Sequence, residues 1–185
     1  MKDECVADPR TLNRARFEAV AAEVYEPLQR YLRRRAASSD ADELLDDVLL
    51  VLWRRLDDIP PGAVLPWCYG VARRALANQR RSTRRRRNLL ERLGSSPASV
   101  SMNDVDVPEL EVAFEQLGEA DRELLRLWAW EELEPREIAV VLGITVNAAS
   151  LRLGRAKQRL RAEYRRQNDD LSGHMVHRHT GELRQ

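Results

Sequence analysis

EPREIAVVLGITVNAASLRLGRAKQRLRAEY, residues 134–164, has the pattern of a short helix, a tight turn and a longer basic helix. Pro135 suits the first position of the short helix, and Gly143 suits the left-handed turn that ends it. Thr145 then supplies an N-cap for the second helix. An ordinary helical hairpin has the same outline. The small residue Ala139 at the crossing and the basic second helix favour a DNA-binding helix-turn-helix.

Apolar residues on these two helices have the spacing needed to hold them together. They are Ile138, Leu142, Ile144, Ala149 and Leu153. Burial of this set leaves an outward face on the second helix. The face contains Ser150, Leu151, Gly154 and Arg155. We expect it to lie in a DNA major groove while Arg152, Lys157 and Arg159 neutralise phosphates.

The net charge of the chain is only +1, so overall charge does not indicate nucleic-acid binding, but its distribution is uneven. Eight of the fifteen residues in 73–87 are arginine, and seven residues in 152–166 are lysine or arginine. Acidic residues gather in 39–58 and 94–121. A single charge run is usually a solvated helix face. Two basic runs, each on a helical pattern, favour contact with phosphate backbones.

Helical periodicity extends over most of the chain. Apolar residues three and four apart predict helices over 17–32 and 40–56, and a third from near Leu65 into the arginine run. Pro27 predicts a kink or break in the first helix. Ser39 and Asp40 predict a side-chain N-cap for the second. Two further helices are expected on either side of Gly118. Since no alternation of period two persists, the predicted fold is all-α with almost no strand.

Changes in composition divide the chain into segments. We predict a flexible N-terminus (1–14), a first small helical domain (15–90), a flexible linker (91–109), a second small helical domain (110–166) and a disordered tail (167–185). The linker is rich in Ser, Pro, Asp and Asn, and the tail lacks enough apolar surface to pack. The expected architecture is therefore two helical domains joined by a flexible connection.

Membrane, disulfide, metal and catalytic functions are disfavoured. No apolar run approaches the roughly 18–20 residues that span a bilayer, and the N-terminus lacks a signal-peptide core, which predicts a cytoplasmic protein. Cys5 and Cys68 have neither disulfide-framework nor metal-ligand spacing. No nucleophile–base set or glycine-rich phosphate loop indicates an enzyme, and no cofactor is expected. We interpret His174, His177 and His179 as a chance cluster and predict no metal site.

Two sequence blocks carry a family resemblance. The first is DADELLDDVLLVLWRRL at 40–56 followed by PWCYGVARRALANQRR at 66–81, and the second is LEVAFEQLGEADRELLRLWAWEELEPREIAVVLGITVNAASLRLGRAKQRL at 110–160. In this order they resemble an extracytoplasmic-function (ECF, group 4) sigma factor of the sigma-70 family of bacterial RNA polymerase. The resemblance implies a sigma region 2-like domain at 15–90 and a sigma region 4-like helix-turn-helix domain at 110–166.

The resemblance also implies a function and residues for it. The chain would bind core RNA polymerase, direct it to promoters and help to melt the minus-ten element. Contact with the β′ clamp helices is implied for Asp42, Glu43, Asp46, Asp47, Leu49 and Trp53. Capture of the melted minus-ten strand is implied for Arg73, Arg74, Asn78, Arg80, Arg81 and Arg84. Asn78 suits a base edge because its amide both donates and accepts hydrogen bonds.

Apolar and aromatic residues in these helices have a second interpretation as core. Leu49, Leu52 and Trp53 fit either a polymerase contact or the core, and for Leu52 we expect the core. Trp67 and Tyr69 could stack on bases, but aromatics at this spacing more often pack inside a bundle. We therefore expect burial, above all for Trp67.

The resemblance also implies which residues contact the double-stranded minus-thirty-five element. They are Asn147, Ser150, Leu151, Arg152, Gly154, Arg155 and Lys157. Arg155 is suited to a bidentate guanine contact. Ser150 stands where the family often has Lys or Arg, and Gly154 where it often has a bulky residue, so this face is less basic than usual. The resemblance further implies docking of the second domain on the β flap and regulation by an anti-sigma factor.

Two alternatives belong to other classes. A polymerase-independent helix-turn-helix regulator would bind duplex DNA and use the first domain as a sensor or dimerisation module. A helical adaptor would use its arginines to contact acidic proteins. Affinity for core polymerase separates the sigma factor from the regulator. Steep loss of DNA binding with salt would count against the adaptor.

Overall fold

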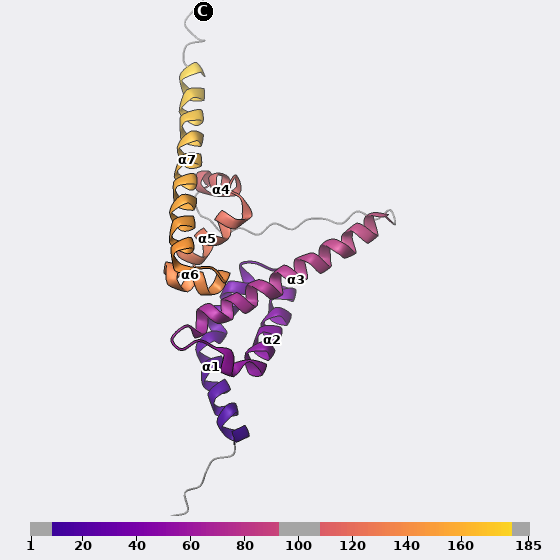
Figure 1. Ribbon diagram of the computed structural model, residues 1–185. Helices are drawn as coiled ribbons and strands as arrows, with labels where there is room; N and C mark the ends of the chain where they lie inside the picture. Colours follow the sequence, from indigo (N-terminus) through magenta and orange to yellow (C-terminus); the bar gives the residue numbers. More distant parts are fainter. Residues whose placement is uncertain (1–8, 93–107, 179–185) are drawn as a thin grey trace, which may run out of the picture. The chain divides into compact units, whose positions relative to one another are not determined.

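The computed structural model describes residues 9–92 and 108–178, and all regular secondary structure in these two ranges is helical (Figure 1). The predicted all-α fold is confirmed. Contacts divide the chain into two compact units. The first contains α1 to α3, and the second contains α4, α5, α7 and the start of α6.

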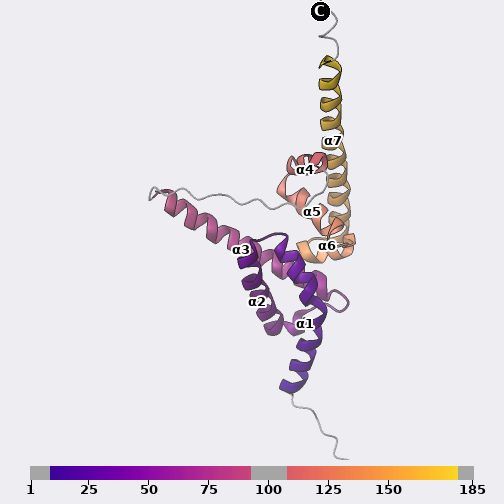
Figure 2. The same cartoon turned by 180° about the vertical axis from the view of Figure 1, so that it is seen from behind.

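The first unit is a bundle of three helices, α1 (Pro9–Arg33), α2 (Ser38–Arg54) and α3 (Val64–Arg92), with a short 3-10 helix at Leu56–Asp58. Each of the three packs against the other two. Their apolar stripes form the core, which includes Val24, Leu28, Tyr31, Leu32, Leu45, Val48, Leu52, Cys68, Ala72 and Leu76. The C-terminal part of α3 extends beyond α1 and α2 in both views (Figures 1 and 2). The C-terminal end of α3 therefore stands away from the bundle, whereas Arg74 and Arg85 line a groove against α2.

The second unit is built around a long helix. Its elements are α4 (Pro108–Glu115), α5 (Glu119–Ala129), α6 (Pro135–Leu142) and α7 (Val146–Arg178). Both α4 and α5 pack against α7. The predicted break at Gly118 is confirmed, since this residue is the N-cap of α5. Buried residues of this unit include Ala113, Leu117, Leu124, Leu127, Ile138, Ala149, Leu153 and Ala156.

Two local features of the first unit differ from expectation: α1 has no break at Pro27, and α2 has no side-chain N-cap at Ser39. α1 continues through Pro27 without a break. Leu28, Tyr31 and Leu32, which follow it, are fully buried, and their packing offsets the hydrogen bond that proline cannot donate. The N-cap of α2 is Ala37, not Ser39. Its carbonyl accepts hydrogen bonds from the amides of Asp40 and Ala41, so the helix starts without a side-chain cap.

The helices also extend past the predicted domain boundaries. α1 begins at Pro9 inside the expected flexible N-terminus, because proline favours a first helical position and good helix formers follow. α3 ends at Arg92 and α4 begins at Pro108, so the structure leaves a shorter connection than 91–109. α7 continues to Arg178 instead of ending near residue 166, since no proline interrupts it and Gly173 alone does not stop a helix. The remaining expectations for the linker and the tail fall outside the described residues.

Two further features bear on the excluded functions. In the described ranges no single helix is long and apolar enough to cross a membrane; α6 and Val146–Asn168 reach that length and hydropathy only as a pair bent by 105°. Cys68 is buried in the first unit as a free thiol. Burial is the larger cause and the negative charge of Glu23 the smaller cause that together raise the pKa of this thiol to about 12. The side chains of the histidine cluster lie outside the described residues.

Candidate nucleic-acid interface

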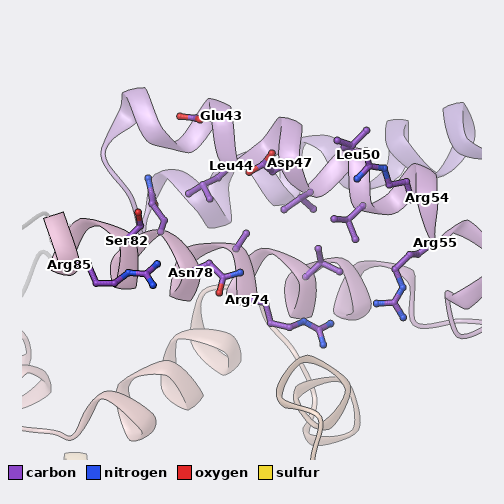
Figure 3. A pocket seen from close by; sticks show the side chains of 15 residues that line it. Glu43, Leu44, Asp47, Leu50, Arg54, Arg55, Arg74, Asn78, Ser82 and Arg85 are labelled. Carbon is purple, nitrogen blue, oxygen red and sulfur yellow. The ribbon is translucent and has the colours of Figure 1, made fainter.

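A groove with a volume of about 660 Å³ runs between α2 and α3 of the first unit (Figure 3). The α2 side and its C-terminal end supply Glu43, Leu44, Asp47, Val48, Leu50, Val51, Arg54 and Arg55. The α3 side supplies Val71, Arg74, Ala75, Asn78, Gln79, Ser82 and Arg85. The lining is apolar at its base with polar and charged groups around it. Such a cavity suits a planar, hydrogen-bonding group such as a nucleobase.

Asn78 lies on the α3 side of this groove (Figure 3). Its side-chain oxygen accepts a hydrogen bond of 2.6 Å from the guanidinium of Arg81. The contact fixes which end of the amide carries the oxygen, so the NH₂ group remains to donate to a ligand. Arg73 and Arg74 are exposed on the same helix. Of the predicted minus-ten residues, Arg74 and Asn78 line this groove and Arg81 contacts Asn78, whereas Arg80 and Arg84 line a separate cavity; their contact with DNA stays a prediction.

The acidic residues predicted to contact polymerase lie on two different faces of α2. Asp42, Asp46, Leu49 and Trp53 follow one another at spacings of three and four residues, which places them on one face. Trp53 is 46% exposed there and contacts Phe17 edge to face. Glu43 and Asp47 lie on the neighbouring face and line the groove.

The apolar and aromatic predictions divide between core and surface. Leu52, Trp67 and Tyr69 are buried, as expected, and Tyr69 packs against the ring of Tyr31. Leu50 is 45% exposed at the groove and was not among the predicted site residues. Its place in a continuous apolar run gave no signal that it faces solvent. Arg85 was also missed, although it belongs to the arginine run.

In the second unit, local hydrogen bonds define the ends of the predicted helix-turn-helix. The Glu137 carboxylate accepts a hydrogen bond of 2.8 Å from the backbone amide of Glu134, immediately before α6 begins at Pro135. Gly143 has a φ of +64°, the left-handed conformation predicted for the turn. The Thr145 hydroxyl accepts a hydrogen bond of 3.2 Å from the amide of Ala148 and so caps α7, as expected.

The two helices meet at 105°, which is within the range of a DNA-binding helix-turn-helix. Ile138, Ala149 and Leu153 are buried between them, whereas Leu142 and Ile144 are only partly buried. The outward face is exposed at Asn147, Ser150, Leu151, Arg152, Gly154 and Arg155. Leu151 is 53% exposed there. The predicted reading face is therefore accessible along the first turns of α7.

Two basic residues of α7 are held by α5 instead. The ammonium of Lys157 lies over the ring of Trp128. Burial is the larger cause and the positive charge of Arg161 the smaller cause that together lower the pKa of this amine. Arg159 forms an ion pair with Asp121. Both side chains therefore have partners within their own domain, and their contact with phosphates stays a prediction.

Comparison with known proteins agrees with the division of the chain into two helical domains. The RNA polymerase sigma factor CnrH of Cupriavidus metallidurans is 30% identical to the chain over 139 residues, which is 67% of this chain and 73% of that protein. The family description "Sigma-70 region 2" matches residues 18–86, and "Sigma-70, region 4" matches residues 109–160. The chain belongs to the extracytoplasmic-function sigma factors of the sigma-70 family.

Other relatives of this sigma factor agree in fold. The RNA polymerase sigma factor NccH of Alcaligenes xylosoxydans xylosoxydans is 26% identical over 136 residues, again 67% of this chain and 73% of that protein. The sigma factor RpoE, solved with the anti-sigma factor NepR from Bartonella quintana, matches with a TM-score of 0.59 and 20% identity. The alignment covers 80% of this chain and 96% of that one. CnrH, solved with the cytosolic domain of CnrY, matches with a TM-score of 0.56 and 23% identity over 83% and 94% of the two chains.

Membership of this family establishes the general function. Region 2 and region 4 make this sigma factor a transcription initiation factor, which directs RNA polymerase to promoters. Its macromolecular partners are core RNA polymerase and promoter DNA. The first unit contains region 2 and therefore the groove, and the second contains region 4 and therefore the helix-turn-helix.

Proposed function

We propose that this sigma factor opens promoters with three separate surfaces. The outer face of α2 docks on the β′ clamp helices of core polymerase. The groove and the arginines of α3 hold the melted minus-ten strand. The exposed face of α7 reads the minus-thirty-five duplex. The groove beside Asn78 is the observation that carries this proposal, because a chain with both a single-strand site and a helix-turn-helix is a sigma factor rather than a regulator that binds duplex DNA alone.

Polymerase docking by α2 is supported by charge and exposure. Asp42 and Asp46 share one face with the exposed ring of Trp53. An acidic face with an apolar centre suits a basic partner helix, because charges steer the encounter and the aromatic ring provides buried area. Glu43 and Asp47 line the groove, so we assign them a smaller part in docking.

Strand capture by α3 is supported by the groove chemistry. A single strand needs a positive surface for its phosphates and a site for an unstacked base. Arg73, Arg74 and Arg80 provide positive charge, and the free donor of Asn78 meets a base edge in the groove. The groove accepts a base only after it leaves the duplex. Binding therefore favours the melted state through differential affinity.

Duplex reading by α7 is supported by the exposed residues of its first turns. Arg155 is suited to a guanine, and Arg152 to a phosphate. Ser150 and Gly154 leave the centre of this face small and uncharged. We expect fewer base contacts here than in a more basic relative, with more of the promoter affinity coming from the minus-ten strand.

The regulation and location of the chain follow from its relatives. Two solved structures of similar sigma factors contain an anti-sigma factor or a partner's cytosolic domain. We expect such a partner to occlude the α2 face or α7, and the second unit to rest on the β flap. ECF sigma factors are soluble regulators, so we assign this chain to the cytoplasm. It supplies no catalysis of its own, because the polymerase performs the chemistry.

The test is transcription in vitro with the full chain and sigma-free bacterial core polymerase on a genomic promoter library, with 5′ ends mapped. Discrete start sites that share two spaced upstream motifs are expected. Intact duplex binding without core association or start sites would overturn the proposal and favour the stand-alone regulator. Arg86 is exposed on α3 outside the groove, so Arg86→Gln should give the same start sites as the unsubstituted protein.

A further inference from the structure

The groove between α2 and α3 has walls of opposite charge. Arg74 and Arg85 line it on α3, and the carboxylates of Glu43 and Asp47 line it on α2. In the part of the chain that the structure describes, neither carboxylate has an ion pair or a hydrogen bond, so no side-chain bridge closes the groove from the α2 side. The acidic wall therefore keeps its hydrogen-bond acceptors open to a ligand.

Asp47 and Asn78 lie on opposite walls of this groove (Figure 3). The side-chain oxygen of Asn78 accepts a hydrogen bond from Arg81, so its NH₂ group is left to donate. The ionised carboxylate of Asp47 has acceptors only. A ligand in the groove therefore meets an acceptor on one wall and a donor on the other.

The lining between these two side chains suits a nucleobase. Val48 and Val71 line it as buried residues, and Val51 and Ala75 line it as partly buried ones. A planar ring can pack on these apolar groups while its Watson–Crick edge meets the polar walls. The hydrogen-bonding groups of the two walls then decide which base is accepted.

We propose that Asp47 makes the groove select a base that carries an exocyclic amino group, namely adenine, cytosine or guanine, and reject thymine. This inference rests on the proposed function of the groove and adds a specificity-determining residue on α2. The amino group donates to the carboxylate, and a neighbouring ring nitrogen or carbonyl accepts from the Asn78 amide. Carboxylates read the amino group of cytosine in the same way in duplex recognition.

Thymine fits the same walls poorly. Its single ring N–H lies between two carbonyl oxygens, so a carboxylate that accepts this hydrogen also approaches a carbonyl oxygen of like partial charge. A carbonyl left without a donor in a partly desolvated groove weakens binding. Arg74 and Arg85 on the opposite wall offset the repulsion between Asp47 and the phosphates of the strand, so the carboxylate acts on base choice.

The experiment measures binding of holoenzyme, assembled from the full chain and core polymerase, to promoters premelted across the minus-ten element. Each non-template position is set in turn to adenine, cytosine, guanine or thymine. At one position the best amino-bearing base should bind about tenfold more tightly than thymine. There, an analogue that lacks only the amino group should lose most of this advantage. The analogues are purine for adenine, 2-pyrimidinone for cytosine and hypoxanthine for guanine.

Two variants at adjacent positions of α2 assign this preference to Asp47. Asp47→Asn should reduce the ratio to about twofold or less, because an amide either accepts from an amino group or donates to a carbonyl. Most of the change should come from tighter binding of thymine, which a folding defect does not produce. Asp46→Asn makes the same charge change on the docking face, so it should lower core affinity and leave the ratio between bases unchanged.

A base ratio that survives Asp47→Asn at every position would overturn this assignment. A smaller ratio caused only by weaker binding of the amino-bearing base would also contradict it, because Asp47 would then not reject thymine. Either result, together with normal start sites and weak binding of the premelted promoter by Asn78→Asp, would leave the proposed function intact. Absence of initiation on every promoter would overturn the proposed function and, with it, the assignment of Asp47.

Discussion

The ammonium of Lys157 lies 3.3 Å from the centroid of the Trp128 ring. This contact joins α7 to α5. It involves the same ammonium group that the sequence predicted to contact a DNA phosphate. A cation held over an indole contributes about 0.5–2 kcal/mol, more when it is partly desolvated. Basic residues at neighbouring positions of one helix therefore have different surroundings, and we predict different effects when they are replaced.

Lys157→Ala and Arg152→Ala should differ in the salt dependence of duplex binding by the holoenzyme. The slope of log K against log salt concentration is negative, and the loss of one phosphate contact makes it shallower by about 0.9. We expect this change for Arg152→Ala, because Arg152 is exposed on the reading face. For Lys157→Ala we expect an almost unchanged slope and a lower melting temperature. An equal loss of slope in both variants would show that Lys157 leaves Trp128 to bind DNA.

Asp46→Arg and Asp47→Arg make the same charge change at adjacent positions on different faces of α2. Asp46→Arg should weaken core polymerase binding about tenfold or more, since like charges at an interface cost several kcal/mol. Asp47→Arg should keep core affinity within about twofold and change open-complex formation, because Asp47 lines the groove. Binding to fluorescent core polymerase measures the first effect, and permanganate reactivity of the minus-ten bases measures the second. Equal loss of core affinity would refute the two-face assignment.

Two glycines of the helix-turn-helix should respond to alanine with opposite signs. Gly154→Ala should raise the free energy of unfolding by up to about 1 kcal/mol, because alanine is the better helix former. A Cβ at this position meets no atom within 4 Å. Gly143→Ala should lower it by about 1–2 kcal/mol, since its φ of +64° is strained for an L-residue. Urea unfolding with unchanged m-values checks both, and a stabilising Gly143→Ala would contradict the turn geometry.

Cys68 should be inert in the native state and should make stability fall at high pH. In a Cys5→Ser background, a thiol reagent at pH 8 should label Cys68 only as fast as the first unit opens. Burial raises the pKa of this thiol to about 12 from its ordinary value of 9. Its contribution to stability is therefore complete below about pH 9 and is lost as pH rises toward 12. Urea unfolding of this protein and its Cys68→Ala variant from pH 8 to 11 measures the difference, and the stability advantage of cysteine over alanine should shrink as pH rises. A constant difference would mean that the thiol is not buried as described.

The sequence predicted the helix-turn-helix well because its signals are local. Proline, glycine and threonine at the ends of α6 and α7 each satisfy a backbone requirement within a few residues. The start of α2 was predicted less well. Ser39 has the side chain of an N-cap, but the chain turns at Ala37, where the packing of α1 and α2 places the first helical carbonyl. Tertiary packing therefore overrode the capping preference.

The candidate site was predicted in composition but not in arrangement. Exposed Arg and Asn on α3 follow from the arginine run itself. The division of α2 into a docking face and a groove face depends on which side of the helix meets α3, and helical periodicity alone does not give that. Leu50 could not be predicted for the same reason. It lies in a continuous apolar run, in which the sequence does not separate an exposed leucine from a buried one.

Binding of the Asn78→Asp holoenzyme to a promoter premelted at minus ten tests the central claim most directly. The substitution keeps an oxygen that accepts from Arg81, and it replaces the NH₂ donor that we assign to the base with a second oxygen and a negative charge. Binding to a promoter premelted at minus ten should fall about tenfold, while core affinity and binding to the minus-thirty-five duplex stay unchanged. Binding to the premelted promoter equal to that of the unsubstituted protein would contradict the claim that the groove beside Asn78 captures the melted strand.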